Sequence, residues 1–138
     1  MTDRELVAKR LAYVVTCVED LRRHAQPDRI GSDPVQSRFI EHTLQLAIQA
    51  MLDAASGIVS GERLGEPRTN HELLDLLARG DWIPAEHVDR YRRIVGFRNV
   101  LVHQYLQVDP EIVRDVVTRQ LDDLLAFVSS VREKLGPA

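Results

Sequence analysis

Cysteine, aromatic residues and long apolar runs are all scarce in this chain. Cys17 is the single cysteine among 138 residues, so no disulfide can form within the chain. Aromatic residues make up 5% of the sequence, so a core must rest on aliphatic side chains, a balance that favours helices over a β-sandwich. No apolar run approaches a membrane span, and the first residues, MTDRELVAKR, lack the apolar core of a signal peptide. We therefore expect a cytoplasmic protein with no membrane contact.

The chain also lacks an excess of positive charge. Its net charge is -3, with 44% apolar and 28% charged residues, a balance typical of one globular domain spanning residues 1–138. Nucleic-acid binding is not excluded, because only the local field at a site must be positive. Arg90, Arg92, Arg93 and Arg98 lie close together and are a candidate for such a field. The alternative is a solvated helix face.

Five helical segments are predicted from apolar spacing and clear boundary signals. Apolar residues recur at alternating steps of four and three, and Asp-Pro pairs and glycines mark starts and ends. The predicted segments run from about Asp3 to Ala25, from Asp33-Pro34 to Gly61, from the capping box at Thr69 to Gly80, from near Pro84 into residues 96–105, and from Asp109-Pro110 to Gly136-Pro137. No stretch alternates with period two. The expected fold is therefore all-α, an antiparallel helical bundle.

The second predicted helix has no clear polar face. Apolar residues surround it from Phe39 to Leu52, which indicates a helix that is buried on more than one side. In so small a domain, the second buried side is a candidate subunit interface.

The segment GFRNVLVHQY, from Gly96 to Tyr105, collects the polar groups that break phosphodiesters. Asn99 and His103 are four residues apart, so on a helix they share a face, and Asn99 could orient the imidazole. Arg98 and His103 are five apart and diverge by about 140° on an ideal helix. Arginine is long enough to swing round, so the spacing permits a meeting of the two but does not require it.

The chemistry follows from the side chains. Histidine, with an ordinary pKa of about 6.5, accepts and donates protons near neutral pH. Arginine stays charged and matches phosphate geometry, so Arg98 can stabilise the transition state of cleavage. With RNA, the neighbouring 2′-hydroxyl is the nucleophile and no metal is needed. Cleavage requires both an acid and a base, and a two-fold dimer would supply them by placing two copies of Arg98 and His103 around one cleft.

The string RNVLVHQY resembles the signature of HepT-like HEPN proteins: an Arg, four residues, a His, one residue and a Tyr. The segment LQLAIQAMLDAASGIVSG also resembles the second helix of that family. The resemblance implies a dimeric all-helical fold and a metal-independent ribonuclease that acts as a toxin, with transfer RNA a candidate target. It also implies that Arg98 and His103 are catalytic and that Asn99 supports them. No cofactor is expected.

The same resemblance implies a partner. In this family the toxin is usually paired with a minimal nucleotidyltransferase of the MntA type, which transfers AMP to the motif tyrosine. In this sequence that tyrosine is Tyr105. The added phosphate and bulk would repel and obstruct RNA at a site made for phosphate. The alternative is a catalytically silent helical module that binds the same nucleotidyltransferase.

Several further residues have two interpretations. Asp53, an acid inside the apolar second helix, either pairs with Arg98 across the bundle or faces solvent. Val100, Leu101 and Val102 are expected in the core. The remaining histidines show no metal-ligand spacing, so we expect no metal site and assign them to surface or capping positions: His24, His42, His71 and His87.

Overall fold

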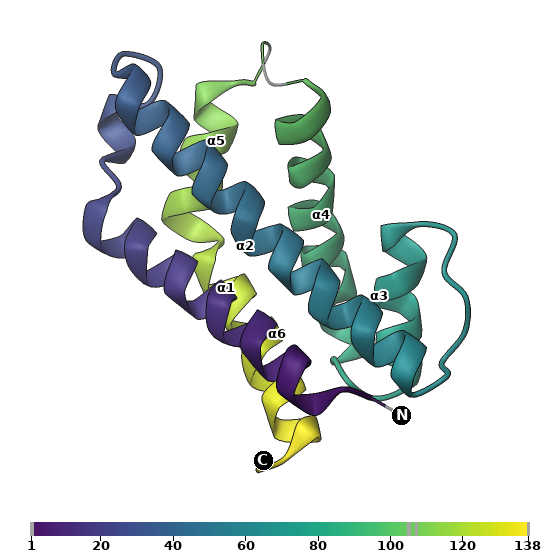
Figure 1. The fold of residues 1–138 in the computed structure, drawn as a ribbon. Helices are drawn as coiled ribbons and strands as arrows, with labels where there is room; N and C mark the ends of the chain where they lie inside the picture. The colour runs from purple at the N-terminus through teal and green to yellow at the C-terminus, as the bar shows by residue number, and fades with distance from the viewer. Residues whose placement is uncertain (1, 105, 107, 138) are drawn as a thin grey trace.

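The computed structural model describes residues 2–104, 106 and 108–137, and this part of the chain is an all-α bundle (Figure 1). The predicted fold class is confirmed: the described residues form six α-helices and two short 3-10 turns, without a β-strand. The elements are α1 (Arg4–His24), η1 (Pro27–Arg29), α2 (Pro34–Gly61), α3 (Asn70–Arg79), η2 (Ala85–His87), α4 (Val88–His103), α5 (Pro110–Arg119) and α6 (Leu121–Leu135).

Side-chain caps fix most of the helix starts that the sequence predicts. Asp33 and Asp109 each accept a hydrogen bond from the backbone N–H two residues on, at 2.9 Å, and the following proline occupies the first helical position. Before α3, Thr69 Oγ1 accepts from the Glu72 N–H at 3.1 Å. The Glu72 carboxylate in turn accepts a hydrogen bond from the Arg68 N–H. The predicted capping box is therefore present, with its return bond one residue further out.

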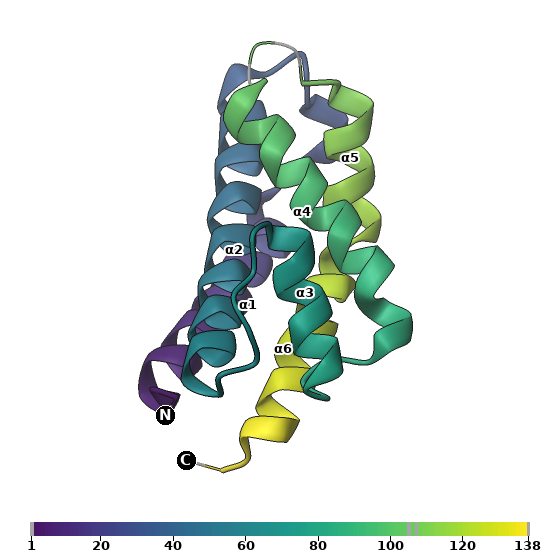
Figure 2. The ribbon, with the colours of Figure 1, turned by 90° about the vertical axis from the view of Figure 1, so that its right-hand side faces the viewer.

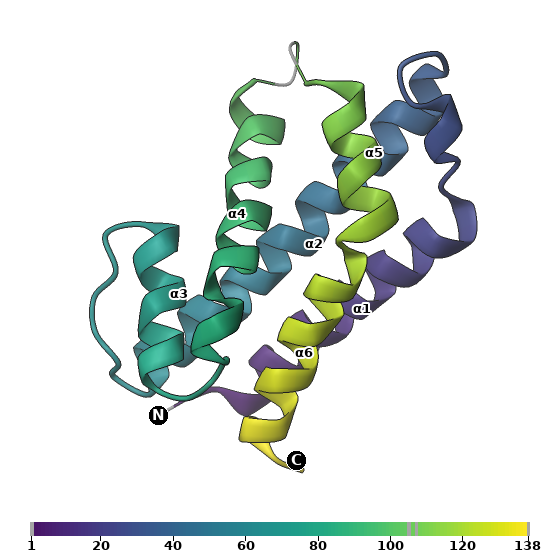
Figure 3. The same cartoon turned by 180° about the vertical axis from the view of Figure 1, so that it is seen from behind.

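Helix α2 is the centre of the bundle. It packs against α1 along most of its length and also contacts α3, α4, α5 and α6. Figure 2 shows α3 and α4 together on one flank of α2, and Figure 3 shows α5 and α6 on the far side. Helices of the same chain therefore bury the apolar surface of α2 on several sides, and its composition alone does not require a subunit interface.

The predicted fifth helix is two helices, and here the prediction of five was wrong. The backbone leaves helical geometry at Gln120 (φ -110°, ψ 2°), between α5 and α6 (Figure 3). Thr118 Oγ1 donates back to the Arg114 carbonyl at 2.7 Å, a bond that bends helices. Apolar side chains continue in register across the break, so spacing alone could not show it.

The core is one cluster to which all six helices contribute. Cys17 lies in it with 3% of its surface exposed, and burial raises the pKa of its thiol, as expected for an inert cysteine. Tyr91 of α4 and Phe127 of α6, the largest fully buried side chains among the described residues, meet edge to face, with ring centroids 5.5 Å apart and planes at 89°. In the described part of the chain, no helix is long and apolar enough to cross a membrane.

The Tyr91–Phe127 contact generates a stability prediction. Phe127→Ala should lower the free energy of unfolding by about 3–5 kcal/mol, because it leaves a cavity in a fully buried position. The Tyr91 hydroxyl is buried without a hydrogen-bond partner among the described residues, and burial raises the pKa of Tyr91 to about 12. Tyr91→Phe removes only that hydroxyl and should leave stability unchanged or higher. Urea unfolding of both variants measures this, and a Tyr91→Phe loss above about 1 kcal/mol would contradict it.

Candidate functional site

Helix α4 carries the predicted motif and ends with it. The helix is regular through His103, and the Gln104 N–H closes it by donating to the Val100 carbonyl at 2.8 Å. Because no turn loosens before His103, ideal helical spacing applies to Arg98, Asn99 and His103. Arg98 is half-buried, whereas Asn99 and His103 are exposed.

Arg98 is held by a side-chain relay on α2. Its guanidinium donates to Gln49 Oε1, and Gln49 Nε2 donates to Asp53 Oδ1 at 2.8 Å. Asp53 therefore acts on Arg98 through an amide, which is neither the direct pair nor the solvent-facing acid of the two sequence interpretations. Sequence reasoning missed Gln49, although a glutamine one turn before an acid in an apolar helix was the available signal.

Ion pairs distinguish Arg90 and Arg92, two of the neighbouring arginines, from Arg98. Arg90 pairs with Asp123 at 3.6 Å, and Arg92 pairs with Asp75. Arg98 has no carboxylate within ion-pair distance among the described residues, and its Nε is buried without a partner. Arg90 and Arg92 are therefore paired with carboxylates. No carboxylate of the described residues contacts Arg98.

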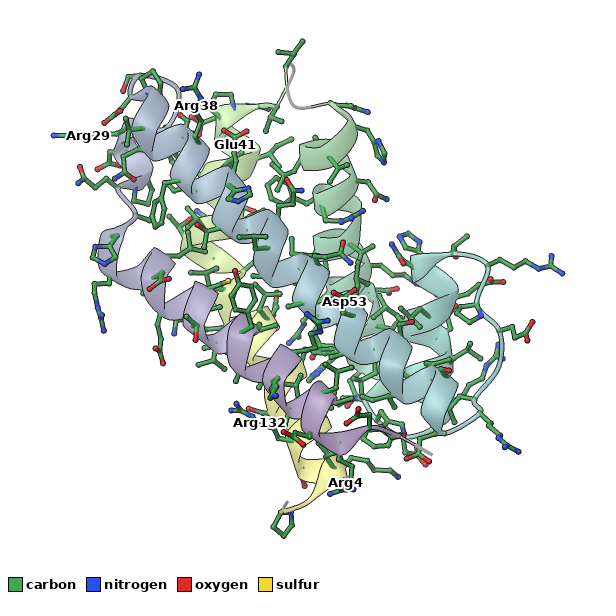
Figure 4. The ribbon with its side chains drawn as sticks, viewed as in Figure 1. Arg4, Arg29, Arg38, Glu41, Asp53 and Arg132 are labelled. Atoms are coloured by element: carbon green, nitrogen blue, oxygen red, sulfur yellow. The ribbon has the colours of Figure 1, made fainter. Side chains whose placement is uncertain are left out.

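Arg98 opens on a cavity between α2, α4 and the start of α3. The cavity has a volume of about 480 Å³, within the range of pockets that take small ligands. Figure 4 shows Asp53 on the part of α2 that passes α4 and α3. The lining is mainly polar: Gln49, Leu52, Asp53, Ser56, Pro67, Arg68, Thr69, Asn70, Leu73 and Arg98. The sequence did not mark the loop residues before α3 as part of this site, because only the packing of α3 brings them close to Arg98.

A single chain does not bring the predicted catalytic pair together. Arg98 faces α2 and the cavity, while His103 does not line it and lies on a side of α4 about 140° away. No side-chain hydrogen bond joins Asn99 and His103 in the described part of the chain. Both side chains are exposed, and support of the imidazole by Asn99 stays a prediction.

The solvent side of α4 is more open than predicted. Leu101 is buried with 5% exposure, but Val100 and Val102 are only half-buried, so their assignment to the core was wrong. Gly96 lies on the same side as Val100 and His103, four and seven residues along the helix. A Cβ at Gly96 would meet nothing within 4 Å.

A second cavity, of about 680 Å³, lies further along α2 toward its N-terminus. Glu41 and Arg38 of α2 line it together with Leu101 and the exposed Leu106 (Figure 4). Burial raises the pKa of Glu41. The two cavities flank the Arg98–Gln49 contact along α2.

The remaining predicted residues have simple outcomes. Tyr105, the predicted modification site, lies outside the described residues. Of the other histidines, His24, His42 and His71 are exposed, and half-buried His87 occupies the N-cap position of α4, as expected. No group of three or more His, Cys, Asp or Glu side chains suited to a metal occurs among the described residues.

Comparison with known proteins agrees with this helical architecture. A family model described as "Ribonuclease HepT-like" matches residues 14–131. The protein named mRNA nuclease HepT, from Shewanella oneidensis, is 24% identical over 129 residues, which cover 93% of this chain and 97% of that protein. The tRNA nuclease HepT of Aphanizomenon flos-aquae is 29% identical over 135 residues, covering 94% of this chain and 90% of that protein.

Solved structures show the same fold. A tri-AMPylated Shewanella oneidensis HEPN toxin in complex with MNT antitoxin is 25% identical, with a TM-score of 0.84 and coverage of 95% of this chain and 98% of that one. The cytosolic protein YutE of Bacillus subtilis is 18% identical with a TM-score of 0.88, covering 99% and 96% of the two chains. Because the family model matches most of the sequence, this chain belongs to the HepT-like ribonuclease family.

Proposed function

We propose that this chain is the toxin of a toxin–antitoxin pair, a metal-independent endoribonuclease that uses Arg98 and His103, with Asn99 in support. The observation that carries the proposal is Arg98, which has no carboxylate partner among the described residues and opens on a polar cavity. His103 is exposed on the same helix. The relatives named mRNA nuclease and tRNA nuclease support RNA as the substrate class.

The proposed reaction is an internal transfer within the RNA. A base removes the proton of the 2′-hydroxyl, whose oxygen attacks the adjacent phosphorus, while an acid protonates the departing 5′ oxygen as its bond breaks. The products are a 2′,3′-cyclic phosphate and a 5′-hydroxyl end. His103 supplies proton transfer, and Arg98 stabilises the extra negative charge on the phosphate oxygens.

We propose that two copies of the chain form the complete site. The separation of Arg98 and His103 on α4 supports this arrangement, because one chain presents them on different sides of a helix. A second copy would bring a second His103, so that one imidazole acts as base and the other as acid. Gly96 supports the same idea: it costs about 1 kcal/mol in a helix interior, and the described part of the chain offers no packing reason for it. A molecule that approaches α4 closely would be such a reason.

The first prediction concerns the two motif side chains. His103→Ala should reduce cleavage of cellular RNA in EDTA by about 100- to 10,000-fold, through loss of proton transfer. Arg98→Lys should cleave RNA at least about tenfold more slowly than wild type, because an ammonium lacks the planar pair of donors that a guanidinium offers to phosphate. Gel analysis of total RNA and of purified transfer RNA measures both.

His24→Ala is the matched control, since His24 is exposed at the end of α1. It should cleave like wild type. Absence of defined fragments from wild-type protein with unmodified Tyr105 would favour the silent binding module. Full cleavage activity of His103→Ala would contradict the proposed role of His103 in proton transfer.

The second prediction compares two glycines in helix interiors. Gly96→Ala and Gly57→Ala should each raise the free energy of unfolding of the chain by about 0.4–1 kcal/mol, since neither Cβ has a severe clash. Only Gly96→Ala should lower cleavage and weaken self-association, because its methyl group would intrude on the contact face. Sedimentation and cleavage assays measure the difference, and equal behaviour of the two variants would count against a close contact at Gly96.

We also propose that a partner nucleotidyltransferase of the MntA type neutralises the toxin by AMPylation of Tyr105. The solved complex of an AMPylated HEPN toxin with its MNT antitoxin supports this proposal. Tyr105 lies two residues after His103, so phosphate added there would compete with RNA for the charge of the site.

The third prediction is the site of this modification. Incubation with the nucleotidyltransferase and ATP should add AMP to wild-type protein and abolish its cleavage of RNA. Tyr105→Phe should acquire no AMP, whereas Tyr13→Phe should be modified normally, although Tyr13 is a tyrosine with 45% of its surface exposed. Intact-protein mass and peptide mapping decide the matter. Modification of Tyr105→Phe would place the site elsewhere.

A further inference from the structure

The cavity beside Arg98 has the make-up of a nucleobase site. Leu52 and Leu73 are among its lining residues, but with 5% and 4% exposure each presents only a small apolar surface. Polar groups from α2 and the start of α3 make up most of the lining. A nucleobase has the complementary pattern, with apolar faces and hydrogen-bonding edges.

Charge is distributed unevenly across this cavity. Arg98 and Arg68 contribute two guanidiniums, while Asp53 is the one acidic side chain among the lining residues that the structure describes. Asp53 lies one turn, about 6 Å, beyond Gln49 along α2. A phosphate bound at Arg98 would therefore leave the attached base free to extend past Gln49 toward Asp53.

The hydrogen bonds of the relay restrict which ligand groups can bind at the Asp53 side of the cavity. Gln49 uses its oxygen to accept from Arg98 and a nitrogen to donate to Asp53 Oδ1. An ionised carboxylate only accepts hydrogen bonds and has more acceptor capacity than one such bond uses. Asp53 therefore favours a ligand edge that presents donors.

We propose that this cavity binds one nucleotide of the RNA next to the cleaved bond, and that Asp53 selects bases with an exocyclic amino group. Adenine, cytosine and guanine offer amino donors, whereas uracil offers only a ring N–H and two carbonyl oxygens. The inference rests on the proposed ribonuclease function and adds a specificity role to Asp53. In this role Asp53 contacts substrate, rather than only positioning Arg98 through Gln49.

Binding of mononucleotides tests the inference without cleavage. AMP, CMP, GMP, UMP and ribose 5-phosphate are titrated into the full ¹⁵N-labelled chain, and amide shifts of residues 49–56 and 67–73 are followed. The three amino-bearing nucleotides should bind about tenfold more tightly than UMP, as expected for one good edge contact. Asp53→Asn should remove that difference, because an amide also donates to the carbonyl oxygens of uracil. Equal binding of all five probes would overturn the proposal. Amide shifts that occur only at residues outside the cavity would overturn it as well.

Cleavage of a randomised RNA pool gives a second readout. Wild-type protein should show depletion of uracil at one position beside the cleaved bond, and Asp53→Asn should relax that preference. A residue that only positions Arg98 would lower the rate equally for every sequence. Asp122→Asn, a carboxylate on α6 far from the cavity, is the matched control and should keep both rate and preference. If wild-type protein cleaves RNA without a base preference, this inference is overturned and the proposed function stands. If it does not cleave RNA, the proposed function is overturned, and the nucleotide titration alone tests whether the cavity binds a nucleotide.

Discussion

The packing of α2 against the other helices is the constraint on which the site depends. Gln49 and Asp53 lie on this helix, and α4 and α3 bring Arg98 and Asn70 to it from two other parts of the sequence. Because α2 is buried on several sides, its few polar side chains stand on a rigid support. The position of Arg98 is thereby fixed by the core of the bundle rather than by a flexible loop.

The same rigid packing keeps Arg98 and His103 of the motif apart. Helix α4 is regular through His103, so its backbone turns Arg98 toward α2 and leaves His103 in solvent. Within one chain, the side chains proposed to bind phosphate (Arg98) and to transfer protons (His103) therefore lie on different sides of α4. A ribonuclease site made from two copies is the economical way to unite them, and it accounts for a helix face with open space at Gly96.

The relay from Arg98 through Gln49 to Asp53 would, in the proposed function, link catalysis with recognition. A direct ion pair would have reduced the charge that Arg98 can offer to phosphate, whereas an amide partner holds the guanidinium while leaving its charge available. The acid is displaced by one turn and lines the same cavity as Arg98. This arrangement underlies our proposal that the cavity binds phosphate at Arg98 and selects a base at Asp53.

The sequence by itself determined the helical class, the main helix starts and the motif on the fourth helix. These features depend on local signals: apolar spacing, Asp-Pro caps and a short string of polar residues. Tertiary structure alone decided the partner of Arg98, the break at Gln120 and the exposure of Val100 and Val102, because each depends on which helix face meets which neighbour. The residues before α3 line the same cavity as Arg98, which lies about 30 positions further along the chain, only because α3 docks on α2 and α4, and no local pattern encodes that contact.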